Sequence, residues 1–469
     1  MEPFRFHLFV CTQQKPEGVP SCPASGSFAL LGALDREMQA RGLGQDVQLT
    51  TCGCMGLCDE GPVMVVYPAG VWYRRVQPSD VSEIVSTHLG DGKPVARLVW
   101  NDAPAMKAMA VEHGEKFREA MAARDKAGTL PERLDQMIRG YMPSRCLLTA
   151  LELDIFTAVG EGASARQIGK KINADARAAG MLLNALVALG LLSKSGEDYK
   201  NTSEAARFFV ESSKDNHRNG LLHIANIWHR WSTLTDAVRS GTRISPGGNN
   251  RYHDNRDDKP ESTRDFIAGM QRNAKDRAPL LVKALGPSAC TSTSTFTSNV
   301  RRVLDLGGGS GAYSIAFART YPDAHCDILD VPEVLPLTSE YVKQAGVSSH
   351  VSLRAGDMLQ DDLGSGYDIV MLNAICHMFS AEQNRSIFHR AHQALAPGGR
   401  LVVQDFILNP DKTGPQHAAL FSLNMLVSTD SGASYSESEY TDWMDAAGFT
   451  RISRINLPGP SSLIVGTKQ

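Results

Sequence analysis

Residues 302–312 read RVLDLGGGSGA, and they decide the fold of the part of the chain that surrounds them. The apolar run at 303–306 is typical of a buried parallel strand. The glycine-rich run at 307–311 follows, and a helical pattern begins near residue 312. Glycine suits such a turn because it lets the backbone approach a ligand and adopts positive φ at little cost. The stretch therefore predicts the first half of a nucleotide-binding βαβ unit.

An acidic residue completes this predicted nucleotide site. The next apolar run, CDILD at 326–330, ends in Asp330, nineteen residues after Gly311. A carboxylate at the tip of that strand can accept hydrogen bonds from both hydroxyls of a ribose, at roughly 1.5–3 kcal/mol each. The spacing alone fits a dinucleotide and S-adenosylmethionine (SAM) equally well.

A resemblance to a known family distinguishes SAM from a dinucleotide. Residues 305–311 (DLGGGSG) resemble the first motif of class I SAM-dependent methyltransferases, and later segments resemble the O-methyltransferases that act on small hydroxylated molecules. The resemblance runs from near residue 130 to the end of the chain. It implies a Rossmann-like sheet that binds SAM through these residues: Gly307, Gly309, Gly311, Asp330, Asp357, Met358 and Asn373.

Length and composition limit the class of protein. The chain has 469 residues, 42% hydrophobic and 21% charged, with a net charge of −3, so we expect two or three globular domains. The charge gives no reason to expect nucleic acid or an anionic membrane as partner. No apolar run has the length of a membrane span, and the N-terminus lacks a signal-type pattern, so we expect a cytoplasmic protein.

The first hundred residues hold a group of cysteines: Cys11, Cys22, Cys52, Cys54 and Cys58. In a cytosolic chain such crowding favours a metal over disulfides, and four thiolates can hold a [2Fe–2S] cluster or a tetrahedral zinc. Residues 54–73 resemble the thioredoxin-like [2Fe–2S] ferredoxins. That resemblance implies Cys11, Cys22, Cys54 and Cys58 as ligands and leaves Cys52 as an extra thiol. Zinc, or a domain that has lost its cluster, is the alternative.

Two helices are expected around the cysteine-rich domain. Residues 80–89 predict a helix that closes the domain, with Ser79 as its N-cap. Residues 100–128 are rich in Ala, Glu, Lys and Arg and predict an exposed linking helix with no chemistry of its own.

The middle of the chain predicts three helices and a short wing at 192–199. A winged helix raises DNA binding as a hypothesis, but the helix at 174–191 carries an apolar face and no basic cluster. Residues 145–212 instead resemble the dimerisation domain of the same O-methyltransferases, which implies a homodimer. Tryptophans and histidines at 221–238 fit either a core or a substrate wall.

The whole chain is thus expected to be α/β: a doubly wound Rossmann-like SAM-binding sheet, a winged-helix dimerisation domain and an N-terminal thioredoxin-like domain. The expected division is a [2Fe–2S] ferredoxin domain at 1–98, a linker helix at 99–130, a dimerisation and substrate-wall domain at 131–290, and a methyltransferase domain at 291–469.

Methyl transfer to a hydroxyl needs a base near neutral pH, and imidazole is suited to that task. His377 follows the fourth predicted strand, where the resembling enzymes carry a histidine general base. The resemblance also implies acidic partners for that histidine. Asp405 falls at one such position, whereas Ser434 falls at the other, so the second acid is absent.

These residues leave three functions open. The first is O-methylation of a small hydrophobic or aromatic molecule, with the cluster in a redox, regulatory or partner-docking role. The second is a SAM-binding redox enzyme that receives electrons from the cluster or from an electron-transfer partner. The third is a non-catalytic, redox-responsive SAM-binding protein.

Overall fold

The computed structural model describes residues 3–15, 19–244, 260–286 and 300–469. The chain divides into two compact units, residues 1–140 and 141–469. The threonine- and serine-rich composition of 291–298 predicts an exposed insertion, and the polar composition of 240–263 predicts a loop; the first stretch and most of the second lie outside the described residues.

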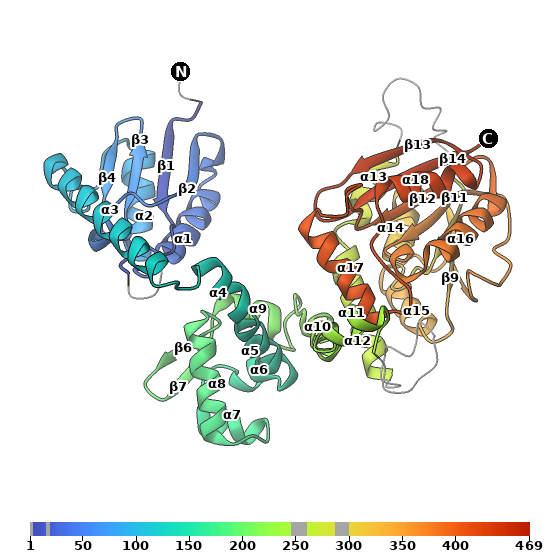
Figure 1. Ribbon diagram of the computed structural model, residues 1–469, viewed down its shortest axis with the longest axis horizontal. Helices are drawn as coiled ribbons and strands as arrows, with labels where there is room; N and C mark the ends of the chain where they lie inside the picture. Colours follow the sequence, from blue (N-terminus) through green and yellow to red (C-terminus); the bar gives the residue numbers. More distant parts are fainter. Residues whose placement is uncertain (1–2, 16–18, 245–259, 287–299) are drawn as a thin grey trace. The chain divides into compact units, whose positions relative to one another are not determined.

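The first unit is built on a four-stranded sheet in the order β2-β1-β3-β4 (Figure 1). Its strands are β1 (Phe6–Cys11), β2 (Val47–Cys52), β3 (Met64–Tyr67) and β4 (Val71–Tyr73). Strands β1 and β2 are parallel, and β3 is antiparallel to both of its neighbours. The cysteines Cys11 and Cys52 stand opposite each other at the carboxyl ends of the parallel pair. Both cysteine-containing loops therefore begin at the same end of this sheet.

The helices of this unit are α1 (Ser27–Ala40), α2 (Val81–Glu83) with its π-helical continuation η4 (Ile84–Gly90), α3 (Ala103–Lys126) and α4 (Glu132–Arg139); the short 3₁₀ turns are η1 (Leu43–Gln45), η2 (Cys58–Glu60) and η3 (Pro78–Asp80). The predicted cap at Ser79 is wrong. The side chains of Gln77 and Asp80 form a capping box two residues earlier, because Pro78 starts the 3₁₀ turn.

The second unit opens with helices and a small sheet. The helices are α5 (Tyr141–Glu152), α6 (Ile155–Val159), α7 (Ala165–Lys171), α8 (Ala176–Ala188), α9 (Ser203–Phe209), α10 (Arg218–Trp231), α11 (Leu234–Ser240), α12 (Pro260–Ala274) and α13 (Ala278–Ala284). The sheet has the order β5-β7-β6, with β5 (Ala163–Ser164), β6 (Leu192–Ser195) and β7 (Asp198–Asn201). The hairpin of β6 and β7 is the predicted wing.

The rest of this unit is a seven-stranded sheet in the order β10-β9-β8-β11-β12-β14-β13. Its strands are β8 (Arg302–Leu306), β9 (His325–Asp330), β10 (Val351–Ala355), β11 (Tyr367–Asn373), β12 (Leu395–Asp405), β13 (Phe449–Asn456) and β14 (Ser462–Lys468). Strand β14 runs antiparallel to the other six strands, which are parallel to one another. The intervening helices are α14 (Ala312–Thr320), α15 (Leu335–Gln344), η5 (Cys376–Met378), α16 (Ala381–Ala394), α17 (Gln416–Ser428) and α18 (Glu437–Ala446).

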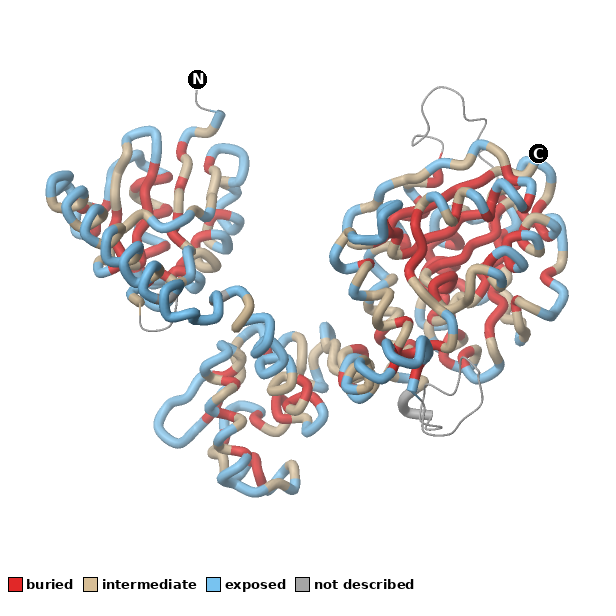
Figure 2. Tube along the Cα trace, viewed as in Figure 1, coloured by how far each residue is buried: buried red, intermediate tan, exposed pale blue. Residues whose placement is uncertain are grey.

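Helices cover both faces of this sheet, and for this reason its central strands are buried along their length (Figure 2). Leu304 and Leu372 point to the face covered by α16 and α18, whereas Val303 and Met371 point to the face covered by α13 and α14. The order of the strands reverses between β8 and β11. A ligand of such a sheet binds at the carboxyl ends of the strands, at this switch point.

Candidate active site

The glycine loop between β8 and α14 has the backbone that the sequence predicts. Gly307, Gly309 and Gly311 have φ angles of 67°, 55° and 76°, in the left-handed region. A Cβ on Gly307 would come within 3.0 Å of the Ile375 side chain and 3.2 Å of the terminal methyl of Met358. The loop therefore needs glycine for its conformation, and at Gly307 also for the close approach of neighbouring side chains.

Asp330 ties this loop to the end of β9. Its Oδ2 accepts a hydrogen bond from the Gly309 backbone N at 2.8 Å, and its Oδ1 accepts one from the Val331 N at 2.8 Å. The residue is only 8% exposed. A carboxylate has about four acceptor positions and can accept several hydrogen bonds at once. The predicted ribose acceptor therefore lies beside the glycine loop.

A buried acid lies beneath the loop. Asp305 accepts a hydrogen bond from the Ser314 hydroxyl at 2.7 Å and from the Asn373 amide nitrogen at 3.4 Å. Complete burial raises the pKa of Asp305 to about 6. The Oδ1 of Asn373 is buried and has no hydrogen-bond partner. A buried acceptor without a donor costs free energy, so this atom at the end of β11 suits a ligand that brings an N–H or O–H group.

Asp357 and Met358 follow β10 on the other side of the glycine loop. Asp357 Oδ1 accepts a hydrogen bond from the Leu359 N at 2.8 Å, and its own N donates to Asp361 Oδ2 at 2.8 Å. The Met358 side chain is buried against the glycine loop, as its approach to Gly307 shows. All seven residues predicted to bind the cofactor thus lie at the carboxyl ends of β8, β9, β10 and β11, or in the loop that follows.

His377 lies in the turn η5, after β11, and Asp405 ends the adjacent strand β12. His377 Nδ1 and Asp405 Oδ1 are 2.7 Å apart, and the His377 backbone N also donates to Asp405 Oδ2 at 3.2 Å. Their side chains are 7% and 2% exposed. Because an ionised carboxylate only accepts, it holds the proton of the imidazole on Nδ1 and leaves Nε2 as the nitrogen that can take a proton.

A third residue, not predicted from the sequence, joins the hydrogen-bonded pair of His377 and Asp405. The hydroxyl of Tyr440, on α18, donates to Asp405 Oδ2 at 3.0 Å. The residue lies in a segment that reads only as an amphipathic helix, SESEYTDWMDAA, and one tyrosine in such a pattern carries no signal of a buried carboxylate nearby. Only the packing of α18 against the sheet brings the two groups together.

Ser434 takes no part in the His377 group. It is 3% exposed, its hydroxyl donates to the Ala418 carbonyl at 3.0 Å, and its N donates to the Ser422 hydroxyl at 3.3 Å. The position that resembles that of a second acid therefore holds the end of a loop against α17 instead.

Aromatic side chains surround His377. The Phe421 ring lies edge-on to the imidazole with 4.8 Å between centroids, and Phe406 lies at 6.2 Å. Farther along α17, Asn424 Oδ1 accepts from the indole N–H of Trp231 at 2.9 Å. This bond joins α10, which carries the predicted aromatic residues, to the helix that faces the histidine. The imidazole of His377 therefore lies against two aromatic rings, and the helix that carries Phe421 also carries Asn424.

The predicted metal ligands gather in the first unit as two pairs. The Cys11 thiol interacts with that of Cys22, and this interaction, ahead of burial, lowers the pKa of Cys11 to about 6. Cys54 and Cys58 lie with 3.6 Å between their sulfurs, and Lys15 Nζ is 3.0 Å from the Cys58 sulfur. Among the described residues, no group of three or more His, Cys, Asp or Glu side chains is arranged to hold a single metal ion.

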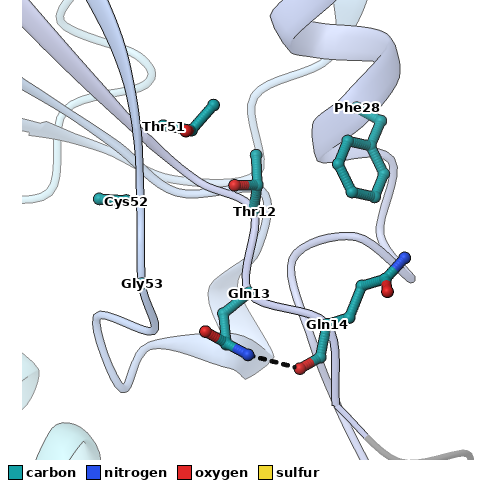
Figure 3. A pocket seen from close by; sticks show the side chains of 7 residues that line it. All are labelled: Thr12, Gln13, Gln14, Phe28, Thr51, Cys52 and Gly53. Atoms are coloured by element: carbon teal, nitrogen blue, oxygen red, sulfur yellow. Dashed lines mark hydrogen bonds between the residues drawn. The ribbon is translucent and has the colours of Figure 1, made fainter. Parts of the chain in front are cut away.

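Cys52 lies opposite Cys11 at the end of β2 and is the fifth thiol of this region. Burial, followed by the nearby thiols Cys11 and Cys54, raises the pKa of Cys52 to about 11. Cys52 lines a shallow pocket of about 530 Å³ at the ends of β1 and β2, and Figure 3 shows its lining residues: Thr12, Gln13, Gln14, Phe28, Thr51, Cys52 and Gly53. The one hydrogen bond drawn there runs from the Gln13 amide to the Gln14 carbonyl, at 2.9 Å.

Helix α3 covers the cysteine loops, although the sequence predicts an exposed linker. Four of its side chains pack against the core that holds Cys11 and Cys22: Ala105, Met106, Met109 and Ala110. A Cβ on Gly56 would lie 2.8 Å from the Ala110 Cα, so the loop touches the helix backbone. His113 Nε2 and Asp59 Oδ2, 2.9 Å apart, join the same two segments.

Two regions of the chain match known protein families. Residues 231–450 match the O-methyltransferase domain, and residues 135–212 match the O-methyltransferase dimerisation domain. The 3-hydroxy-5-methyl-1-naphthoate 3-O-methyltransferase of Streptomyces sahachiroi is 32% identical over 74% of this chain and 100% of its own length. The tetracenomycin 8-O-methyltransferase TcmO of Streptomyces glaucescens is 31% identical over 72% of this chain and 97% of its own length.

Solved structures show the same fold. The structure of PigF with S-adenosylhomocysteine (SAH) aligns with a TM-score of 0.65 and 28% identity, over 72% of this chain and all of that one. The chain belongs to the O-methyltransferases that carry a dimerisation domain. It is therefore a SAM-dependent enzyme with a Rossmann-like methyltransferase fold and small-molecule substrates, and the dimerisation domain supports a homodimer. Within the described residues, no helix has the length and apolar character needed to span a membrane.

Proposed function

We propose that the enzyme methylates a phenolic hydroxyl of a small aromatic molecule and that His377 is the general base. The observation that carries this proposal is the 2.7 Å contact between His377 Nδ1 and Asp405 Oδ1 beside the aromatic rings of Phe406 and Phe421. The relatives act, by their names, on a hydroxynaphthoate and in tetracenomycin synthesis. Flat aromatic acceptors suit these apolar surroundings.

The two ring nitrogens of His377 have different roles in this reaction. Asp405 holds the proton on Nδ1 and stabilises the imidazolium that forms when Nε2 takes the acceptor's hydroxyl proton. The acceptor oxygen then forms its bond to the methyl carbon as the bond from that carbon to the sulfonium sulfur breaks, which leaves SAH. General-base help of this kind contributes roughly 10²- to 10⁴-fold, and alignment of the two substrates contributes much of the remainder.

Seven residues are proposed to hold SAM: Gly307, Gly309, Gly311, Asp330, Asp357, Met358 and Asn373. The fit rests on the left-handed backbone of the glycine loop, on the Asp330 carboxylate beside it and on the unpartnered Asn373 Oδ1. Asp330 would accept from ribose hydroxyls and Asp357 from the adenine amino group, with Met358 packed on the ring. Asn373 Oδ1 would accept from the ammonium of the methionine part.

The test compares the wild type with His377→Gln, using SAM and 3-hydroxy-5-methyl-1-naphthoate as probe substrates. Glutamine keeps a polar side chain of similar length but cannot act as a base near neutrality. We expect SAH formation to fall by about 10²-fold or more while SAH binding, measured by calorimetry, stays within a few-fold. Turnover close to that of the wild type would refute the role of His377. If neither protein methylates the hydroxyl, the proposed acceptor class is wrong.

We further propose that residues 1–98 form a thioredoxin-like module that holds a [2Fe–2S] cluster through Cys11, Cys22, Cys54 and Cys58. Each iron of such a cluster takes two thiolates, so two separate pairs of thiols suit two irons better than one tetrahedral zinc. The cluster supplies one-electron chemistry when it is bound. The Lys15 ammonium beside Cys58 would offset the charge of the thiolates.

Iron and acid-labile sulfide, measured on anaerobically purified protein, test this second proposal. About two of each per chain are expected, with an electron paramagnetic resonance signal after reduction. Cys54→Ser should lower both, whereas Cys52→Ser, in the same loop but in neither pair, should not. Zinc, or equal loss in both variants, would leave the module without a cluster role.

The remaining assignments follow from these two proposals. We propose residues 99–130 as the linker, 131–290 as the dimerisation and substrate-wall domain, and 291–469 as the catalytic domain, in a cytoplasmic homodimer. The two pairs of thiols also support a second proposed function. In it, an electron-transfer partner reduces the cluster, and the cluster serves a SAM-dependent redox reaction. SAH released in step with methylated product would exclude that reaction.

A further inference from the structure

The carboxylate of Asp405 is surrounded by four donors. His377 contributes its Nδ1 at 2.7 Å and its backbone N at 3.2 Å, the Phe406 backbone N donates at 2.8 Å, and Tyr440 donates its hydroxyl at 3.0 Å. Three of these come from the two segments that carry the pair itself. Tyr440 is the one donor from a distant element, helix α18, and the one whose removal leaves the backbone of the site unchanged.

Tyr440 is held rigidly in this place. The residue is fully buried, and its ring packs against Tyr435, Trp443 and Phe388 with centroids 6.1, 5.5 and 6.4 Å away. A hydroxyl fixed in this way determines where Asp405 Oδ2 points, and therefore where Oδ1 meets the imidazole. Burial and the charge of Asp405 raise the pKa of Tyr440 well above its ordinary value, so the hydroxyl remains a donor throughout the neutral range.

We propose that Tyr440 is a positioning residue that sets both the orientation and the basicity of His377 through Asp405. This inference rests on the proposed role of His377 as base. A hydrogen bond to a carboxylate disperses its negative charge, so the Tyr440 hydroxyl weakens the hold of Asp405 on the imidazolium. His377 is then neutral, and ready to accept a proton, at a lower pH than it would be beside an unshared carboxylate.

Three titratable groups near the pair keep one charge state. Desolvation raises the pKa of Cys376 and of Tyr435, and it also raises that of Tyr313, which senses the Asp405 charge. All three groups are therefore neutral around pH 7. A pH effect around neutrality therefore does not arise from these three groups; His417 on α17, whose ring lies 6.1 Å from that of Phe406, is the other titratable side chain packed there.

Tyr440→Phe is the variant that tests the proposal, because it removes one oxygen and keeps the ring in its packing. Tyr435→Phe is the matched control. Tyr435 belongs to the same aromatic cluster and is 6% exposed, but its hydroxyl donates to the Phe379 carbonyl, at 2.6 Å, and not to Asp405. Thermal unfolding of the two variants shows whether loss of a buried hydroxyl has disturbed the fold.

The first readout is the dependence of kcat/KM on pH, with SAM and 3-hydroxy-5-methyl-1-naphthoate. In Tyr440→Phe we expect the acidic limb to move to higher pH by roughly half to one pH unit, with an unchanged KM for SAM. The activity below the limb then falls about three- to tenfold. Tyr435→Phe should keep the limb of the wild type. An unshifted limb in Tyr440→Phe, or the same shift in both variants, would reduce Tyr440 to a packing residue.

The second readout needs no turnover and separates this inference from the proposed reaction. Protein labelled with ¹³C at histidine Cε1 is titrated in complex with SAH, and His377→Gln assigns the His377 signal. The midpoint of that signal should move upward in Tyr440→Phe alone. Loss of methylation in His377→Gln with no movement here would overturn the inference and leave the reaction intact. Movement here with full activity in His377→Gln would do the reverse.

Discussion

Asn373 donates a hydrogen bond from its amide nitrogen to Asp305, 3.4 Å away, and leaves its amide oxygen buried without a partner. Asn373 ends β11, and Asp305 is the last residue but one of the neighbouring strand β8, at the point where the strand order reverses. The bond fixes which way the amide is turned, because only its nitrogen can donate to a carboxylate. The amide oxygen of Asn373 is therefore available to a ligand that binds at the carboxyl end of the sheet.

The first prediction concerns this amide oxygen. Asn373→Leu removes the acceptor, and we expect SAH affinity to fall by about 5- to 30-fold, or about 1–2 kcal/mol. Isothermal calorimetry measures the affinity. Asn201, on β7, also has a buried amide oxygen without a partner, but it lies in the small sheet away from the glycine loop. Asn201→Leu should leave SAH affinity unchanged; equal losses would mean that the Asn373 oxygen faces no ligand.

A second prediction concerns the glycine loop. Gly311 and Gly346 have similar φ angles, 76° and 72°, but a Cβ on Gly311 would lie 3.2 Å from the Ile328 side chain, whereas Gly346 has no atom within 4 Å. Alanine at either site costs about 1–2 kcal/mol of left-handed strain. Only Gly311→Ala also disturbs the loop, so it alone should weaken SAH binding. Denaturation and calorimetry on both variants separate strain from ligand binding.

The third prediction concerns α3 and the cysteine loop. Alanine at Gly56 would place a Cβ 2.8 Å from the Ala110 Cα, so Gly56→Ala must push the loop and the helix apart. We expect the loop cysteines to react faster with a thiol reagent such as 5,5′-dithiobis(2-nitrobenzoate) in metal-free protein. Gly53→Ala, three residues earlier and with open space around it, is the control. Unchanged thiol reactivity in Gly56→Ala would show that α3 does not shield these cysteines.

A fourth prediction concerns pH and the first unit. His88 is 2% exposed, and burial lowers its pKa from 6.5. The Tyr73 hydroxyl accepts from the Val95 N at 2.9 Å and lies 2.8 Å from His88 Nδ1, to which it can donate when that nitrogen carries no proton.

Below pH 6.5 the unfolded chain binds a proton at this histidine that the folded chain resists. The free energy of unfolding should therefore be full above pH 6.5 and decline as the pH falls through and below that value. Guanidinium titrations of the whole protein, followed through the transition of the first unit, measure this decline. His88→Leu should be less stable at pH 7.5 yet show a smaller decline; an equal slope would place the acid sensitivity elsewhere.

The sequence alone was enough to place the residues proposed to bind the cofactor at one end of the large sheet. The glycine loop, Asp330 and Asn373 each follow a short apolar run directly, and the carboxyl ends of parallel strands meet at one edge. The resemblance implied the partnership of His377 and Asp405, and the neighbouring strands β11 and β12 bring the turn that carries His377 to Asp405. These patterns are local in the sequence. The regular sheet places the residues that follow its parallel strands close together in space.

Other features depended on packing between elements distant in sequence. Tyr440 reaches Asp405 only because α18 lies against the sheet, and Ser434, placed by resemblance opposite the histidine, instead holds a loop to α17. Helix α3 reads as a polar linker, since alanine and methionine on one face are too weak a stripe to predict burial, yet it covers the cysteine loops. Side-chain partners across such contacts have no fixed spacing along the chain, so only the tertiary structure could decide them.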